Sequence, residues 1–273
     1  MGDSSELRRA AGIGAPLARR ELSIAGRTPM TLTFLGTRGN IDISTRRHRR
    51  HTSTLVSHRG VDVMIDCGAD WLRQLSRVAP DAIVVTHAHP DHVGGLRNGA
   101  PCPVYAPTAV WRIIGRWPIH RRHRLDARVP RQVRGIRFEA VPVDHSVIAP
   151  AVAYRITGGA AAVFYAPDVL QIAHEADVLQ GTSLYIGDGA TITRPIVRIE
   201  RSTGVPVGHA PIVTQLEWCA QAGLSRAIFT HCGRAIVAGP PDIEEQIAAL
   251  GQAQGVDTAI ARDGLRITVR SRG

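Results

Sequence analysis

Four potential metal ligands lie within six residues of this chain, directly after a short apolar segment. Residues 82–85 read Ala-Ile-Val-Val, which predicts a buried strand, and His87, His89, Asp91 and His92 follow that strand. Imidazole and carboxylate groups are ligands that zinc, iron and manganese all accept. The chain has 12 histidines among 273 residues, so three of them within six positions exceed what chance placement gives. The sequence therefore predicts a metal site in a loop at the end of a strand.

Three more polar side chains end apolar segments further along the chain. His145, Asp168 and His231 each follow a run of mostly Val, Ile, Ala, Phe or Tyr residues that predicts a strand. A single His or Asp in such a place is most often a turn residue. Loops at the ends of strands can nevertheless bring side chains from distant segments to one site. Taken with the first group, these residues extend the predicted metal site.

Apolar residues make up 44% of the chain, which is enough for the core of one mixed α/β domain of this length. Residues 30–273 are expected to form that domain, and residues 1–29 are expected to form a flexible, Arg-rich extension. Strands are predicted at residues 30–36, 53–57, 61–65, 82–85, 136–143, 151–156, 161–165, 183–186, 226–230 and 265–269, and helices at residues 71–78, 109–115, 169–179, 210–223 and 243–254.

The formal net charge is +10, and all 33 basic residues are arginine. Two clusters, at residues 46–51 and 120–124, combine Arg with His and could neutralise phosphate groups. The other interpretation of each cluster is a solvated loop surface. Since no aromatic residues that could stack on bases interleave with the clusters, a nucleic-acid partner is open but not favoured.

The four cysteines, Cys67, Cys102, Cys219 and Cys232, form no Cys-x-x-Cys pair, which argues against a zinc knuckle and against a disulfide framework. No apolar run reaches the ~18 residues of a membrane-spanning helix. The N-terminus also lacks the apolar core of a secretory signal. The expected location is cytoplasmic, with no membrane partner.

The run His87-Ala88-His89-Pro90-Asp91-His92 and the later strand-end residues resemble the metallo-β-lactamase superfamily, over about residues 30–270. The resemblance implies an α/β fold of the αββα type, a four-layer sandwich in a single domain. It also implies two divalent metal ions, and the sequence leaves zinc, manganese and iron open. By this resemblance, His87, His89 and His145 hold the first metal, Asp91, His92 and His231 hold the second, and Asp168 bridges the two.

Other segments resemble the branch of the superfamily that contains PhnP-like phosphodiesterases and ribonuclease Z. His209 lies shortly before the last metal ligand, and in this branch a histidine in that region is the general acid for the leaving alkoxide. The alternative is a histidine that opens a helix and satisfies a backbone group. Residues 34–39 resemble the branch's opening strand and glycine turn, which would let Arg38 hold a phosphate oxygen. A surface role for Arg38 is equally open.

Two aspartates close further strands. Residues 64–68 resemble a strand-end motif of the superfamily in which an aspartate, here Asp66, orients a metal-bound histidine. The alternative for Asp66 is a buried carboxylate that caps a turn. Asp188 is expected in a tight turn between two glycines, and its function is left open.

The resemblance implies a dinuclear metal-dependent hydrolase, and within that class a phosphodiesterase that cleaves a small cyclic or nucleotide phosphodiester. A metal-bound hydroxide would attack phosphorus, with Asp91 and His209 as the catalytic residues. A carbonyl ester hydrolase of the lactonase, thioesterase or glyoxalase-II type is the alternative, because the same ligands serve both reactions. A nucleic-acid-binding protein with structural metals is a further alternative.

Two expectations about partners follow from the same resemblance. The chain has no long insertion like the arm with which ribonuclease Z grips transfer RNA, so a transfer-RNA substrate is not favoured. Proteins of the family are often dimers, which leaves a homodimer open.

Overall fold

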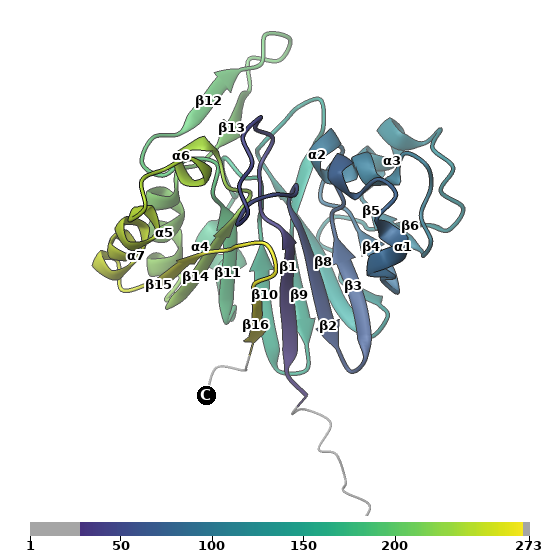
Figure 1. Ribbon diagram of the computed structural model, residues 1–273, viewed down its shortest axis with the longest axis horizontal. Helices are drawn as coiled ribbons and strands as arrows, with labels where there is room; N and C mark the ends of the chain where they lie inside the picture. The colour runs from purple at the N-terminus through teal and green to yellow at the C-terminus, as the bar shows by residue number, and fades with distance from the viewer. Residues whose placement is uncertain (1–27, 270–273) are drawn as a thin grey trace, which may run out of the picture.

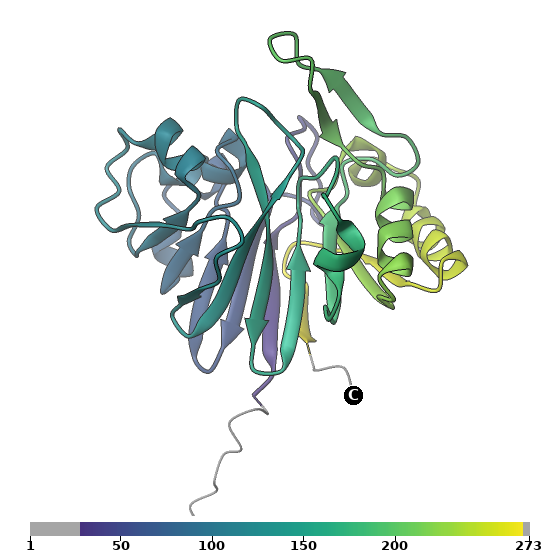
Figure 2. The same ribbon diagram turned by 180° about the vertical axis from the view of Figure 1, so that it is seen from behind.

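The structure of the chain is a computed structural model, and it describes residues 28–269. The expected extension, residues 1–29, lies outside the described residues except for its last two positions. Two large β-sheets pack face to face, with helices on the outer side of each sheet (Figure 1, Figure 2). The predicted αββα sandwich in a single domain is therefore confirmed.

Each large sheet has seven strands. The first sheet consists of β1 (Met30–Gly36), β2 (Ser53–His58), β3 (Val61–Ile65), β4 (Ala82–Val84), β5 (Val104–Ala106), β6 (Arg122–Arg124) and β16 (Arg266–Val269), in the spatial order β16-β1-β2-β3-β4-β5-β6. The second consists of β7 (Arg131–Val133), β8 (Ile136–Val143), β9 (Ala151–Gly158), β10 (Ala161–Tyr165), β11 (Leu184–Asp188), β14 (Arg226–Thr230) and β15 (Asp257–Ile260), in the order β15-β14-β11-β10-β9-β8-β7. A separate hairpin pairs β12 (Ile196–Ile199) with β13 (Pro206–His209).

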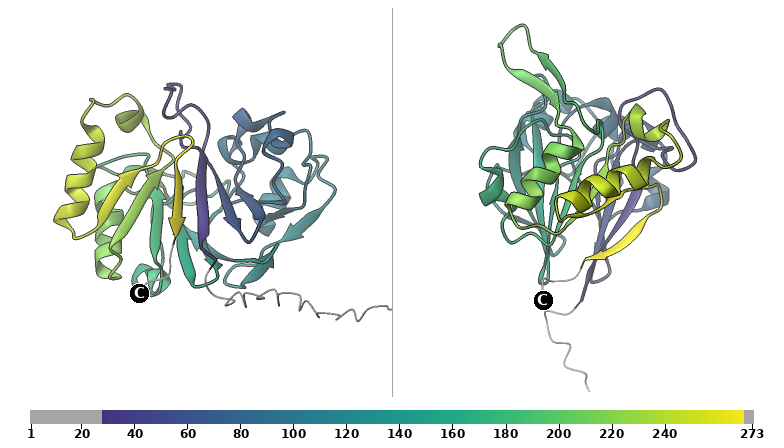
Figure 3. Two further views of the ribbon diagram at one scale, coloured as in Figure 1. Left: turned by 60° about the horizontal axis from the view of Figure 1, so that its bottom comes forward. Right: turned by 90° about the vertical axis from the view of Figure 1, so that its left-hand side faces the viewer.

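The helices form the two outer layers, as the turned views show (Figure 3). The first sheet is covered by α1 (Leu75–Val78) and α3 (Thr108–Ile114), with the short 3-10 turns η1 (Ala69–Trp71) and η2 (Gly94–Leu96) nearby. The second sheet is covered by α4 (Glu175–Leu179), α5 (Ile212–Gln221) and α7 (Ile243–Ala253). Two further short helices, α2 (Pro90–Val93) and α6 (Arg234–Val237), lie toward the upper edge in Figure 1.

The main core lies between the two sheets. Leu32 and Val63 of the first sheet pack in one buried cluster with Phe138 and Ile186 of the second. Along β1, buried residues alternate with half-buried ones, which is the period of two that a strand imposes on its side chains. Because both sheets share this core, the loops at one edge of the sandwich are held in fixed positions relative to one another.

Two predicted helices are shorter than their patterns indicated. The helix predicted at residues 71–78 is broken, because Arg73 has a φ of +65° that a right-handed helix does not contain. The helix predicted at residues 169–179 forms only at α4. The carbonyl oxygen of Gln171, which would accept from the NH of Glu175 in that helix, accepts instead from the NH of Asp144 at 2.9 Å. Long-range hydrogen bonds have therefore replaced helical ones.

No helix within residues 28–269 is long and apolar enough to cross a membrane. All four cysteines are buried free thiols, as their spacing indicated.

His48 is buried in the loop between β1 and β2, and it should make stability depend on pH. Its Nδ1 lies 2.9 Å from Oγ1 of Thr37, which donates to Asp263 at 2.8 Å. Burial lowers the pKa of His48 below 6.5, so the unfolded chain binds this proton more readily than the folded one. The free energy of unfolding should therefore fall as pH drops below 6.5, by at most about 1.4 kcal/mol per pH unit from this group.

Urea unfolding at about pH 7.5 and about pH 5.5 measures this effect. The loss of stability between the two conditions should be smaller in His48→Gln than in the wild type. Equal losses in the two proteins would contradict the assignment to His48.

Candidate metal centre

The seven predicted ligands meet at the edge of the sandwich where four strands end. His87 and His89 follow β4, and α2 begins at Pro90, whose fixed φ suits the first turn of a helix. That helix carries Asp91 and His92. The remaining ligands follow strands of the second sheet: His145 after β8, Asp168 after β10 and His231 after β14. All seven lie in connected groups whose ligand atoms are within 4.8 Å of one another.

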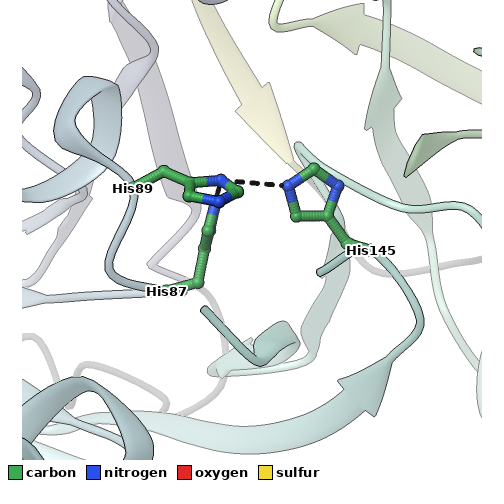
Figure 4. Close-up of side chains that lie close together, drawn as sticks. All are labelled: His87, His89 and His145. Carbon is green, nitrogen blue, oxygen red and sulfur yellow. Dashed lines mark hydrogen bonds between the residues drawn. The ribbon is translucent and has the colours of Figure 1, made fainter. Parts of the chain in front are cut away.

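His87, His89 and His145 form the first group, and Figure 4 shows their rings pointing toward one another. Nδ1 of His89 lies 3.0 Å from Nε2 of His87 and 3.2 Å from Nε2 of His145. A tetrahedral metal with bonds of about 2.0–2.1 Å would place its ligand atoms roughly 3.3 Å apart, so these separations fit one ion. Burial lowers the pKa of His89 to about 4 and that of His87 well below its ordinary value, which keeps both rings neutral.

The second group lies beside the first. Nε2 of His92 is 2.8 Å from Oδ2 of Asp168, and Nε2 of His231 is 3.2 Å from Oδ2 of Asp91. Within residues 28–269, Nε2 of His92 and Oδ2 of Asp168 are buried without a hydrogen bond of good geometry. Since buried polar atoms normally have partners, this donor set fits a divalent cation. Asp168 stands between the groups, because its other oxygen lies 3.7 Å from Nε2 of His145.

Asp66 holds one of these histidines in place. Its buried carboxylate accepts hydrogen bonds from the backbone NH and the hydroxyl of Thr86, at 2.7 and 2.8 Å, and lies 2.9 Å from Nδ1 of His92. An anionic acceptor at Nδ1 keeps the proton there, so the lone pair of Nε2 faces the ligand cluster. The carboxylate therefore contacts both His92 and the backbone of its neighbouring loop, and its role toward a metal-bound histidine stays a prediction.

Asp66→Asn is expected to weaken metal binding by about 10–100-fold, because an amide no longer enforces the proton position on His92. Competition with a chromogenic zinc chelator measures the affinity, and circular dichroism checks that the variant is folded. Unchanged affinity in a folded variant would contradict this role.

His209 lies beside the cluster. It does not open a helix, so the alternative prediction of a helix-opening histidine is wrong. It is the last residue of β13, and α5 begins only at Ile212. Its Nδ1 lies 2.7 Å from Oδ2 of Asp188 and 3.8 Å from Oδ1 of Asp168. Burial opposes its charge, but the Asp188 and Asp168 carboxylates together outweigh burial and raise the pKa of His209. An imidazole that holds its proton near neutral pH can donate it to a reacting group.

Asp188 is the residue beside the ligand cluster whose role the sequence left open. It ends the buried strand β11 and does not lie in the expected tight turn. Besides the ring of His209, its carboxylate accepts hydrogen bonds from the NH groups of Val169 and Ala190. Its sequence signal was the same as that of the ligands, an acidic residue at the end of an apolar strand.

Arg38 does not line the cavity at this site, contrary to the phosphate contact expected from its motif. Its guanidinium pairs with Asp70 at 2.7 Å and donates to the carbonyl oxygens of Ile41 and Arg49. These contacts occupy the group and fasten the loop between β1 and β2.

The two arginine clusters also make internal contacts. Arg122 donates to three backbone carbonyl oxygens, Arg124 pairs with Asp126, and Arg47 pairs with Glu244. These contacts favour the solvated-loop interpretation of the clusters over a phosphate-binding one.

A cavity of about 350 Å³ opens above the ligand cluster. His209 forms part of its wall, together with Asn40 from the loop after β1 and Ile196 and Arg198 from the hairpin. Such a volume is at the low end of the range for small-molecule sites, about 300–1,000 Å³.

The family model described as Beta-lactamase superfamily domain matches residues 62–232, which are more than half of this chain. The chain belongs to this superfamily. Among curated relatives, ribonuclease Z of Mycobacterium avium (strain 104) is 26% identical over 261 residues, covering 80% of this chain and 90% of that protein. Ribonuclease Z of Methanopyrus kandleri is 33% identical over 94 residues, covering 29% of this chain and 33% of that protein.

Solved structures of superfamily proteins have the same fold. The metallo-β-lactamase fold protein YhfI from Bacillus subtilis matches with a TM-score of 0.67 and 16% identity, covering 88% of this chain and 99% of that one. A diphosphatase from the PhnP family matches with a TM-score of 0.66 and 23% identity, covering 88% and 97%. The expected superfamily is confirmed, and the chain is a metal-dependent hydrolase. The relatives named ribonuclease Z agree with the expected branch.

Proposed function

We propose that this superfamily member is a dinuclear metal-dependent phosphodiesterase that cleaves a small cyclic or nucleotide phosphodiester. One observation carries the proposal: His209, backed by Asp188 at 2.7 Å, stands 3.8 Å from the carboxylate that lies between the two ligand groups. A proton donor beside such a cluster is what departure of an alkoxide from phosphorus requires.

The ligand groups would divide between two divalent cations. Imidazole and carboxylate donors accept zinc, manganese and iron. His87, His89 and His145 would hold one ion, Asp91, His92 and His231 the other, and Asp168 both. When bound, such a pair lowers the pKa of water and neutralises charge that develops on the phosphoryl oxygens.

The protein's own groups account for the remaining requirements. The ring of His209 donates a proton to the leaving oxygen, and Asp188 orients that ring and favours its charged form. Asp91 contributes a negative charge next to His231, at 3.2 Å. The buried cluster keeps bulk water away from these charges, which strengthens their interactions.

Ribonucleolytic cleavage is the second candidate, because the curated relatives named above are called ribonuclease Z. A thioester substrate is less well supported, since a thiolate departs with less help from a proton donor than an alkoxide does. The small cavity favours a small diester over a folded RNA.

Hydrolysis of bis-p-nitrophenyl phosphate by protein loaded separately with zinc and with manganese tests the proposal. Turnover in either form, abolished by chelation and restored by the metal, would support a phosphodiesterase. Cyclic nucleotides and a short RNA with a 3′ extension would then separate the two candidates. The phosphodiesterase proposal would be overturned if metal-loaded protein hydrolysed lactones or thioesters and left all diesters intact.

A further inference from the structure

The hairpin of β12 and β13 stands apart from both large sheets and projects from the edge that carries the metal centre (Figure 1). All four residues of β12 are exposed, including the apolar side chains of Ile196 at 52% and Ile199 at 60%. Grouped apolar side chains at the surface commonly mark a binding site. Since Ile196 also lines the cavity above the ligand cluster, the hairpin forms one wall of that cavity.

The pairing register aligns this wall with the proposed proton donor. Ile196 lies opposite His209, and Arg198 lies opposite Val207. Side chains directly opposite one another in an antiparallel pair lie on the same face, and so do residues two apart along one strand. Ile196, Arg198, Val207 and His209 therefore share a face of the hairpin, and all four line the cavity.

The base of the hairpin is fastened to the metal centre. The NH of Gly208 donates to the carbonyl oxygen of His145 at 2.9 Å, and Nδ1 of His145 lies 2.9 Å from the carbonyl oxygen of Gly208. Gly208 has a φ of +139°, and a side-chain carbon there would lie 1.8 Å from the carbonyl oxygen of Ile196. Only glycine fits this close approach, which fixes the hairpin face relative to the ligand cluster.

Arg198 is the cation on this face without a partner. Within residues 28–269, no carboxylate or carbonyl group pairs with its guanidinium, whereas Arg38 and Arg47 are held by Asp70 and Glu244. A guanidinium that lines a cavity and is not neutralised by the protein is suited to a planar anionic group such as a phosphate or carboxylate.

We propose that this face binds the leaving group of the diester, with the apolar part of that group against Ile196 and Val207 and a second anionic group on Arg198. The inference rests on the proposed phosphodiesterase function. Because strand residues rise by about 3.3 Å, the second anion should lie roughly 7 Å from the oxygen that His209 protonates. The substrate class is thus a phosphodiester whose leaving alcohol carries an apolar ring or chain and a further phosphate or carboxylate.

The reaction on such a substrate is a balanced hydrolysis. One water oxygen forms a bond to phosphorus, and the bond from phosphorus to the leaving oxygen breaks, with its electron pair going to that oxygen. His209 gives its proton to the leaving oxygen and is reprotonated by the proton that the water releases. The products are a phosphomonoester and the anionic alcohol or, from a cyclic diester, one phosphomonoester that carries the freed hydroxyl.

Three methyl aryl phosphodiesters test this assignment with zinc-loaded protein. Their leaving groups are 4-methyl-2-nitrophenol, 4-hydroxy-3-nitrophenylacetate and 4-hydroxy-3-nitrobenzylphosphonate, which differ mainly in the absence or presence of an anion at the distal position. The wild type should prefer an anionic leaving group by roughly tenfold in kcat/KM. In Arg198→Ala this ratio should fall to about one, and the carboxylate and phosphonate arms show which anion is preferred.

Arg201→Ala, which removes the same charge at the exposed tip of the hairpin, is the matched control and should keep the ratio. The assignment would be overturned if the preference for anionic leaving groups persisted in Arg198→Ala or fell equally in both variants. So would a change in oligomeric state in Arg198→Ala, which would make the face an interface between copies of the chain.

Binding of the three free nitrophenols, measured by calorimetry, gives a readout that does not need turnover. If the wild type cleaves no diester, the proposed function fails. Tighter binding of the anionic alcohols that depends on Arg198 would still support the hairpin site, and equal binding of all three would overturn it.

Discussion

Asp168→Ala is expected to abolish hydrolysis, lowering kcat by on the order of 10³-fold or more. The Asp168 carboxylate is buried and lies 2.8 Å from Nε2 of His92, 3.3 Å from Nε2 of His231 and 3.7 Å from Nε2 of His145. In the proposed ligand set it is the anion that both groups share, so its loss would leave the Asp91 carboxylate alone to balance the charge of two cations. Their repulsion should lower the metal content from about two ions per chain to about one.

Metal analysis by mass spectrometry and initial rates on bis-p-nitrophenyl phosphate measure the two effects together. Asp144→Ala is the matched control, because it removes an exposed carboxylate one residue from a ligand and should change neither quantity. A folded Asp168→Ala protein with full turnover would falsify the shared role of this carboxylate.

His209→Ala should lower kcat by about 10²–10⁴-fold on diesters with an alkoxide leaving group, while the metal content is retained. The effect should be much smaller on p-nitrophenyl diesters, because p-nitrophenolate departs without a proton. A residue that only supported the fold would lower both rates equally, so the dependence on the leaving group distinguishes the proton donor from a structural histidine.

Rates on a cyclic nucleotide and on bis-p-nitrophenyl phosphate, with metal analysis of the same samples, make this comparison. His120→Ala removes an exposed histidine far from the cluster in sequence and serves as the control. Loss of metal together with activity in His209→Ala would mean that His209 is a ligand and not a proton donor.

The places of the ligands could be predicted because each depends on a local pattern. A short apolar run is buried as a strand, and the polar residue that follows it must lie in a loop at the strand's end. His87, His145, Asp168 and His231 all follow this rule, and the structure brings them together as expected. Asp188 obeys the same rule, yet nothing local indicates that its partner is a histidine rather than a metal.

Tertiary contacts decided what the local patterns could not. The carbonyl oxygen of Gln171 bonds to the NH of Asp144 and so is not available to the helix that its sequence favours. The guanidinium of Arg38 bonds to Asp70, 32 positions away, and so does not face the cavity. Each competing bond joins residues distant in the chain, whose proximity exists only after the two sheets have packed.

The sequence by itself therefore determined the fold class, the superfamily and the cluster of potential ligands. The tertiary structure decided the surroundings of that cluster. It placed His209 at the end of a strand beside Asp188, with Ile196 directly opposite it in the hairpin. The physical reason is that strand burial depends on neighbouring residues, whereas the direction of a polar side chain depends on which distant partner satisfies its hydrogen bonds or charge.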